Sequence, residues 1–384
     1  MPFQFKTIME QRLEFVMFAN QKAINISSLC RRFGITRRTG YKWLSRFKSH
    51  GLEGLLDNSK RPKTSPGRSS AEIEVPIVSL RKDNPEWGAK KIKKVLERDG
   101  ILAPDKIPSR PTITAIMKRN GLISAEKSQQ AEHWQRFERE SPNELWQMDF
   151  KGYFNLMDKA VCHPLTILDD HSRYNLGLFA CKNQTTKTVK DHLTRLFTIY
   201  GMPQTILTDN GTPWGSSGGT TDEGLRAFTA FEKWLILLNI NISHGKPYHP
   251  QTQGKEERFH RTLKAELLQH EQLKDFVHCQ YKFDKWRTKY NHYRPHEAID
   301  FKVPAELYKP SNRNFPSTIK GPEYGLSDIK KRVGSGGTIC IKRRKYRVGK
   351  AFIGDTVALK STLEDGIYEV YFCNQRIRML NLKT

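Results

Sequence analysis

Three short segments of this chain place acidic side chains where they could bind a divalent metal ion. Asp149 lies inside the apolar run Trp146–Phe150, Asp209 follows a second apolar run, and Glu256 and Glu257 open an amphipathic stretch. A carboxylate inside an apolar strand is costly to bury unless it is paired or bound to a metal ion. Carboxylates from three separate elements can hold two ions, one activating the nucleophile and the other stabilising the leaving oxygen. Together the segments predict two-metal phosphoryl transfer.

Each acidic segment also has a non-catalytic interpretation. Asp209, followed by Asn210 and Gly211, is typical of a tight turn, although catalytic groups also collect at strand ends in α/β sheets. Glutamates at a helix start are favoured by the helix dipole, and surface solvation explains either of them. The sequence contains no Walker-type phosphate loop and no Cys-x-x-Cys pair. The expected cofactor is therefore Mg²⁺, two ions per site, with Mn²⁺ able to substitute.

The charge of the 384-residue chain points to a polyanionic partner. Its formal net charge is +25, from 65 Lys and Arg against 40 Asp and Glu. Residues 1–140 carry a net +13 and residues 310–384 a net +9, while the middle of the chain is nearly neutral. Basic ends around a near-neutral centre favour a catalytic core flanked by modules that hold double-stranded DNA through its phosphates. A merely soluble basic surface is the alternative.

Residues 1–57 have the pattern of a helix-turn-helix DNA-binding domain. Helical spacing of apolar residues begins at Leu13, Gly34 interrupts a second helix, and Thr36 can cap a third. In this geometry the start of the last helix faces base edges in the major groove. The residues there are Arg37, Arg38, Thr39 and Lys42. A helical hairpin with a solvated basic face would show the same pattern.

Three further segments connect this domain to the acidic motifs. Residues 58–70 form a basic linker rich in Pro, Gly and Ser, which could be a tether or lie in a minor groove. Residues 71–125 predict a second helical domain, either helix-turn-helix-like or a plain connecting bundle, with a basic amphipathic helix over Ala89–Arg98. Residues 126–140 are polar and predict a hinge or a helical arm.

Residues 141–310 predict an α/β core with a mixed sheet and helices around it. Strands are expected at Leu145–Phe154, Pro164–Leu168, Tyr174–Ala180, Thr205–Leu207 and Asn241–His244, and helices at Thr188–Tyr200, Leu225–Leu238, Thr252–Leu268 and Leu273–Tyr290. The loop Gly215–Gly224 has no periodicity, and we assign it no role.

Residues 311–384 predict a small β-barrel that binds DNA. Five short strands are expected, at Thr338–Ile341, Lys345–Val348, Thr356–Leu359, Tyr368–Phe372 and Arg376–Met379. Gly and Asp turns separate them. A basic run on one turn suits phosphates, and it consists of Lys342, Arg343, Arg344 and Lys345.

Longer motifs around the acidic residues carry a family resemblance. They are Glu144–Phe150, Leu168–Arg173, Thr208–Gly211, His249–Lys264 and Tyr290–His296. In this combination they resemble the integrase-core family of DDE transposases, which occur in bacterial insertion sequences and are related to retroviral integrases. The motifs lie within about residues 140–310, and the predicted helix-turn-helix and barrel match the usual flanks of that family.

The resemblance implies an RNase H-like core with a catalytic triad of Asp149, Asp209 and a glutamate. The family pattern Gly-x-x-Glu selects Glu257. Helical phase points the other way, because Glu256 lies nearer the centre of the predicted buried side. We expect Glu257 to be the third metal ligand, since phase is weakly defined at a frayed helix start.

The helix that follows could hold the DNA strand beside the scissile phosphate. Its basic residues are Lys255, Arg258, Arg261 and Lys264, and a solvated helix face is the alternative for each. The resemblance implies a transposase that binds its terminal repeats, hydrolyses the 3′ ends and joins them to target DNA, as a homodimer or larger synaptic complex. The rivals are an inactive sequence-specific repressor, a nuclease without strand transfer, and a structural nucleoid protein.

The sequence also bears on where the protein works. No stretch approaches 18 apolar residues, and the first residues lack the apolar core of a signal peptide. Six scattered cysteines are typical of free thiols in a reducing compartment. We therefore expect no membrane association and a place in the cytoplasm or on the nucleoid.

Overall fold

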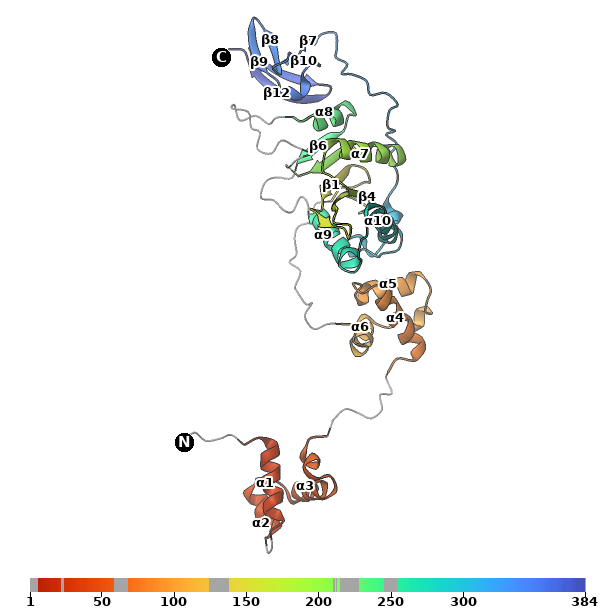
Figure 1. Ribbon diagram of the computed structural model, residues 1–384, viewed down its shortest axis with the longest axis vertical. Coiled ribbons are helices and arrows are strands. Elements are labelled where there is room, and N and C mark those ends of the chain that lie inside the picture. Colours follow the sequence, from red (N-terminus) through yellow and green to blue (C-terminus); the bar gives the residue numbers. More distant parts are fainter. Residues whose placement is uncertain are drawn as a thin grey trace. The chain divides into compact units, whose positions relative to one another are not determined.

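The computed structural model describes residues 6–21, 24–58, 68–123, 138–209, 211, 213–214, 228–244 and 254–383. The chain divides into two compact units, Met1–Ser69 and Ser70–Thr384 (Figure 1). Most of the predicted linker and hinge, the loop Gly215–Gly224, and the motif residues Asn210 and 249–253 lie outside the described residues. No helix within the described ranges is long and apolar enough to cross a bilayer.

The first unit is helical, as its sequence predicts. It contains α1 (Ile8–Ala19), α2 (Ile26–Arg32), α3 (Arg37–His50) and the short 3-10 helix η1 (Gly51–Leu55). Thr36 caps α3 by accepting a hydrogen bond from the backbone of Thr39. Gly40 lets α3 approach α2, because a Cβ there would lie 2.6 Å from Cys30 Sγ. The helix-turn-helix arrangement is confirmed.

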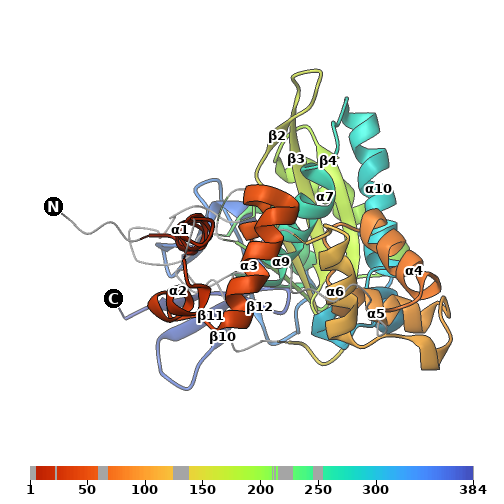
Figure 2. The ribbon, with the colours of Figure 1, turned by 90° about the horizontal axis from the view of Figure 1, so that it is seen from below.

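A second set of helices begins the larger unit. It comprises α4 (Ala71–Asp83), α5 (Ala89–Arg98), the 3-10 turn η2 (Pro104–Lys106) and α6 (Arg110–Arg119). Their shared core contains Ile77, Trp87, Ile92, Val95, Leu96, Ile113, Ile116 and Met117. These helices lie beside the end of helix α10 (Phe276–His292) (Figure 2). There the ring of Trp87 packs on the ring of Tyr293, the residue that follows α10.

The central sheet is mixed. Its strands are β1 (Leu145–Phe150), β2 (Phe154–Asn155), β3 (Val161–Asp169), β4 (Asn175–Cys181), β5 (Thr205–Thr208) and β6 (Asn241–His244). The order is β2-β3-β1-β5-β6, with β4 pairing β3. Strand β3 runs antiparallel to both β1 and β4, whereas β5 runs parallel to β1, and β6 runs parallel to β5. The predicted single strand over residues 145–154 is wrong: it divides at Gly152, whose φ of 72° turns the chain.

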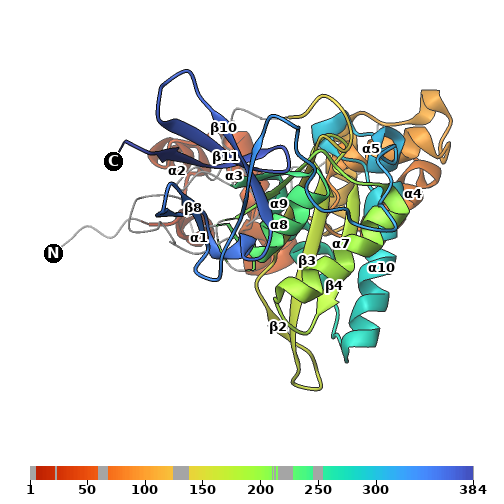
Figure 3. The same cartoon turned by 90° about the horizontal axis from the view of Figure 1, so that it is seen from above.

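Helices cover both faces of this sheet. One face packs α7 (Thr186–Tyr200) and α8 (Ala230–Leu237), with α7 lying along β3 and β4 (Figure 3). The other packs α9 (Gly254–Leu263), which continues into the π turn Lys264–Leu268, and α10. The 3-10 turn η5 (Glu297–Ile299) and α11 (Pro304–Leu307) follow. The predicted α/β core with its mixed sheet is confirmed.

The C-terminal part consists of small antiparallel sheets around one core. Strands β7 (Ile329–Arg332), β10 (Thr356–Ser361), β11 (Ile367–Phe372) and β12 (Gln375–Asn381) form the sheet β12-β11-β10-β7, and β8 (Thr338–Ile341) pairs with β9 (Arg344–Arg347). Phe352, Val357, Val370 and Phe372 fill the space between the sheets. The five predicted strands are present, and the sequence analysis missed β7.

Candidate active site

Strands β1 and β5 bring two of the predicted catalytic residues to neighbouring positions. Their parallel register pairs Gln147 with Leu207, so Asp149 and Asp209 each stand two residues further along adjacent strands. The side chain of Asp149 is about a quarter exposed (26%). The sequence predicted both carboxylates on or after strands, and the structure adds that these two strands are neighbours.

A tight turn fixes the carboxylate of Asp209. The backbone N–H of Gly211 donates a hydrogen bond of 2.9 Å to Asp209 Oδ1. A Cβ at position 211 would lie 3.2 Å from Asp209 Oδ2, closer than most side chains tolerate. The turn and the catalytic interpretations of this motif are therefore compatible, because the turn presents the acid.

A buried glutamate and histidine, which the sequence analysis did not identify, hold the backbone of Asp209. His244 Nδ1 lies 2.9 Å from the carbonyl oxygen of Asp209, and its Nε2 lies 3.0 Å from Glu232 Oε1. The other oxygen of Glu232 closes a capping box with Thr229 at the start of α8. Thr229-x-x-Glu232 was a readable sequence signal for that cap, but nothing in the sequence connects it with Asp209.

The two adjacent glutamates of α9 have opposite surroundings. Glu256 is buried (2% exposed) and accepts a hydrogen bond of 3.0 Å from the hydroxyl of Thr166. Glu257 is exposed to solvent. Burial, followed by the charge of Asp149, raises the pKa of Glu256 well above its usual range. Helical phase was therefore right about which glutamate is buried, while the charge of the exposed Glu257 also acts on Asp149.

A neutral histidine links Glu256 to Asp149. His260 Nε2 lies 2.9 Å from Thr166 Oγ1 and 3.6 Å from Glu256 Oε2, while Nδ1 lies 3.9 Å from Asp149 Oδ2. Thr166 also contacts the carbonyl oxygen of Asp149, at 3.0 Å. Burial, helped by the charge of Lys151, lowers the pKa of His260 to about 4. The imidazole is therefore uncharged near pH 7 and adds no positive charge to the acidic cluster.

The electrostatics of the cluster suit a divalent cation. Burial, together with the charges of Asp209 and Glu257, raises the pKa of Asp149 to about 7. Three carboxylates that repel one another supply hard oxygen ligands of the kind that Mg²⁺ prefers, and a cation would relieve the repulsion. Among the residues that the structure describes, no three acidic, histidine or cysteine side chains are gathered closely enough to hold a metal ion as they stand. The donor chemistry therefore fits, while the ligand cage is not closed.

A second pair of acidic residues, Asp169 and Asp170, holds together the segments around the site. Asp169 accepts hydrogen bonds from the backbone and hydroxyl of Ser172, which close the turn after β3. Asp170 Oδ1 binds Gln147 at 2.6 Å and Lys255 at 2.6 Å. The motif Leu168–Arg173 is thus part of the scaffold, joining β1, β3 and the start of α9.

The residues predicted to contact DNA divide into exposed and engaged side chains. Lys255 is largely buried against Asp170, so its charge is already neutralised. The exposed ones are Arg37, Arg38 and Lys42 on α3, Arg258 and Arg261 on α9, Lys264 in the following π turn, and Lys342, Arg343, Arg344 and Lys345. Thr39 is half-buried because its hydroxyl bonds to Thr36.

The basic run of the C-terminal sheets lies across a hairpin. Lys342 and Arg343 form the two-residue turn between β8 and β9, with φ of 46° and 64°. Arg344 and Lys345 are the first two residues of β9 rather than part of the turn. Both turn residues have the positive φ that two-residue hairpins require, and their side chains are exposed.

Comparison with known domain families accounts for most of this architecture. Residues 139–250 and 238–304 match two integrase core domain families, and residues 328–384 match the C-terminal domain of the IS481 family transposases. Residues 11–63 match a helix-turn-helix domain and residues 39–117 a homeodomain-like domain.

Similar proteins come from insertion elements and retroviruses. The chain is 22% identical over 268 residues to an uncharacterized 31.7 kDa protein of insertion element IS407 from Burkholderia multivorans, covering 67% of this chain and 87% of that protein. It is 33% identical over 126 residues to the Gag-Pro-Pol polyprotein of Mason-Pfizer monkey virus, covering 33% of this chain. That match spans only 6% of the polyprotein.

Among solved structures, the chain is similar to retroviral integrases. The HTLV-2 integrase catalytic core domain in complex with magnesium matches 44% of this chain and 97% of that domain, at 17% identity and a TM-score of 0.32. A chain of the simian T-cell lymphotropic virus intasome in complex with the PP2A regulatory subunit B56 gamma matches 79% of this chain and is itself covered to 99%, at 16% identity and a TM-score of 0.38.

Proposed function

We propose that this chain, whose domains match an integrase core and the C-terminal domain of IS481 family transposases, is a transposase that binds the terminal repeats of its own element, hydrolyses their 3′ ends and joins them to target DNA. The observation that carries this proposal is the position of Asp149 beside Asp209, with the charge of Glu257 raising the pKa of Asp149. Three mutually repelling carboxylates at a strand edge are a liability in a protein that binds no cation there.

In this proposal Asp149, Asp209 and Glu257 hold two divalent ions, Mg²⁺ or in its place Mn²⁺. The bound ions would supply a metal-activated nucleophile and stabilisation of the leaving oxygen. Asp209 is already oriented by the N–H of Gly211, and its backbone is held by His244. Glu257 remains exposed, so it is the ligand with most freedom to complete the site.

The residues behind the carboxylates position them. Thr166 and His260 connect the backbone and side chain of Asp149 to Glu256. Burial and the charge of Asp149 raise the pKa of Glu256 well above its usual range, and the imidazole of His260 is uncharged near pH 7. In this proposal Glu256 belongs to the support of the site, and the cations are bound by Asp149, Asp209 and Glu257.

The remaining domains would hold the DNA. Exposed Arg37, Arg38 and Lys42 at the start of α3 suit base edges and phosphates in a major groove. Arg258, Arg261 and Lys264 suit the strand beside the scissile phosphate. Cutting two ends in concert requires at least two active sites, so we propose a homodimer or larger synaptic complex, acting on the bacterial nucleoid. A sequence-specific repressor with an inactive core is the second candidate.

The deciding experiment is cleavage of a labelled element-end duplex by the full chain with Mg²⁺, comparing wild type with Asp149→Asn. We expect the wild type to nick the 3′ end, and Asp149→Asn to bind the duplex equally well without nicking it. If the wild type binds ends tightly but never cuts with Mg²⁺ or Mn²⁺, the repressor function replaces this one.

A further inference from the structure

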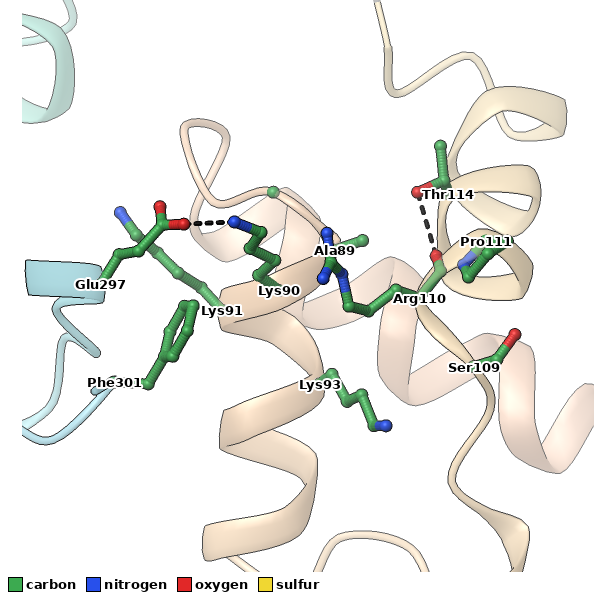
Figure 4. Close-up of a pocket in the computed structure, with 11 residues that line it drawn as sticks. Ala89, Lys90, Lys91, Lys93, Ser109, Arg110, Pro111, Thr114, Glu297 and Phe301 are labelled. Atoms are coloured by element: carbon green, nitrogen blue, oxygen red, sulfur yellow. Dashed lines mark hydrogen bonds and ion pairs between the residues drawn. The ribbon is translucent and has the colours of Figure 1, made fainter. Parts of the chain in front are cut away.

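A cavity of about 670 Å³ opens where α5, the start of α6 and the segment around η5 meet (Figure 4). Four cationic side chains line it, against a single carboxylate, that of Glu297. The cations are Lys90, Lys91, Lys93 and Arg110. None of these cations takes part in the candidate active site around Asp149, Asp209 and Glu257. The cavity therefore has a strong excess of positive charge that the catalytic chemistry does not use.

The backbone at the mouth of α5 adds to this positive character. Gly88 is the N-cap of α5, and it offers no side chain to the first-turn N–H groups of that helix. Free N–H groups at a helix start, together with the helix dipole, favour an anion. Arg110 reaches from the start of α6 toward this end of α5 (Figure 4). Side chain and backbone donors thus converge from two helices.

The positive charges in and around the cavity are only partly compensated. Lys90 forms an ion pair with Glu297, and Lys93 lies 3.7 Å from Glu97, both exposed pairs of the kind that contribute little. Burial and the charge of Arg294, opposed in part by Glu266, lower the pKa of Lys91 to about 7. An anion in the cavity would relieve the cost of keeping this ammonium charged.

The catalytic core supplies one wall of the cavity. Trp87 packs on Tyr293 with ring centroids 5.6 Å apart, and Arg98 donates a hydrogen bond of 3.1 Å to the carbonyl oxygen of Tyr293. Asp300 and Phe301, on the core side, hold positive φ of 54° and 62°. Such backbone is strained for residues with side chains, and Phe301 lines the cavity. The segment of the core that lines the cavity therefore keeps a strained backbone conformation.

We propose that this cavity is a binding site for a backbone phosphate of the element-end duplex, shared by the helices α4 to α6 and the catalytic core. The inference rests on the proposed function for the identity of the duplex. A phosphate held there would contact both the helices α4 to α6 and the catalytic core. A DNA end bound by these helices would thereby be placed against the core. Phosphate contacts of this kind position DNA without reading its sequence.

The sharpest test changes only the cap of α5. Gly88→Asp introduces a negative charge at the cavity mouth, and a Cβ at this position would meet nothing within 4 Å. The matched control is Gly88→Asn, which is of similar size and caps helices equally well but is neutral. Measured by fluorescence anisotropy with the full chain, Gly88→Asp should weaken binding of the end duplex about tenfold, whereas Gly88→Asn should stay within about twofold. Thermal melting should show both variants folded.

A second set of variants measures the phosphate contact itself. The plot of log K against log salt has a negative slope, and Lys93→Ala and Arg110→Ala should each reduce the magnitude of that slope by about 0.9, the value for one lost phosphate contact. Lys94→Ala is the control, since Lys94 lies on the same helix but does not line the cavity. Glu297→Gln removes the competing carboxylate and should tighten binding a few-fold.

The outcomes separate this inference from the proposed function. If wild type binds and cuts ends while the cavity variants keep the slope of the Lys94→Ala control, the cavity is not a phosphate site and the proposed function stands. If wild type fails to select or cut ends, the same variants are measured on a duplex of random sequence. A slope of smaller magnitude with that duplex would support the phosphate site even though the proposed function fails, and an unchanged slope would overturn the phosphate site.

Discussion

The carboxylate cluster of the central sheet and the lysine-lined cavity beside α5 have opposite charge, but burial shifts one pKa in each of them in a similar way. In each, partial burial and neighbouring like charges bring one pKa to about 7, upward for Asp149 and downward for Lys91. They differ in compensation. In the cavity, the carboxylate of Glu297 opposes the positive charges. Among the described residues around Asp149, the histidine that approaches its carboxylate, His260, is neutral and offers no compensating charge.

This difference indicates what each region is built to receive. A partly compensated cluster can exchange its internal partner for a phosphate at small net cost, which suits a DNA backbone that must also be released. An uncompensated acidic cluster favours a cation that stays bound while DNA comes and goes. The two regions would therefore receive the two components of one reaction, metal and DNA. Three predictions test this comparison.

The largest effect should come from Glu257. Glu257→Gln removes a charge that the proposed site needs, and we expect nicking of the end duplex to fall about 1,000-fold, in line with the several kcal/mol that a bound metal ion contributes. Glu256→Gln should retain cleavage within about threefold, because in the proposed site the exposed Glu257, and not the buried Glu256, binds the ions. Single-turnover cleavage at saturating Mg²⁺ measures both.

The reverse result, with Glu256→Gln inactive and Glu257→Gln active, would mean that the buried glutamate is the metal ligand. In that case the Gly-x-x-Glu motif does not identify the catalytic residue of this chain.

A change of intermediate size separates scaffold from DNA contact on α9. Lys255→Met leaves the buried Asp170 without its partner and should lower the free energy of unfolding by about 3 kcal/mol, measured by chemical denaturation. Its effect on the salt dependence of DNA binding should be negligible. The control, Arg258→Ala, changes an exposed residue and should do the opposite. Equal melting of Lys255→Met and wild type would show that Lys255 is free to bind DNA.

The smallest effects concern pH and stability, and they should have opposite signs in the two regions. The pKa of Asp149 rises from 3.8 to about 7 on folding, so its charge costs stability increasingly as the pH rises through that window. Asp149→Asn should therefore stabilise the metal-free protein by about 2 kcal/mol above pH 7 and by nothing near pH 4, with the partial exposure of the group taken into account.

Lys91 should show the mirror image. Its pKa falls from 10.5 to about 7 on folding, so its charge costs most below pH 7 and nothing above about pH 10.5. The gain in stability from Lys91→Met should shrink as the pH rises, again from about 2 kcal/mol. Melting curves of both variants across pH decide the matter. Parallel rather than opposing trends would mean that the two clusters are not electrostatic counterparts.

The sequence by itself determined most of the elements of this protein. Periodicity and capping residues such as Thr36 predicted the helices, and the apolar runs before Asp149 and Asp209 predicted two of the strands, because local pattern and strand alternation are properties of consecutive residues. The net charge of +25 predicted a polyanionic partner. The boundary after Phe150 and the strand β7 were missed, because the first depends on one turn at Gly152 and the second is four mostly polar residues paired only to β10.

Only the tertiary structure decided which side chains work together. Glu256 and Glu257 are adjacent in sequence, and their different burial comes from Thr166 on β3, 90 residues away. The support of Asp209 by His244, and the engagement of Lys255 with Asp170, likewise join segments far apart in the chain. The charged cavity between α5 and η5 brings residue 90 beside residue 297. Burial and charge coupling depend on distances in space, which local sequence patterns do not encode.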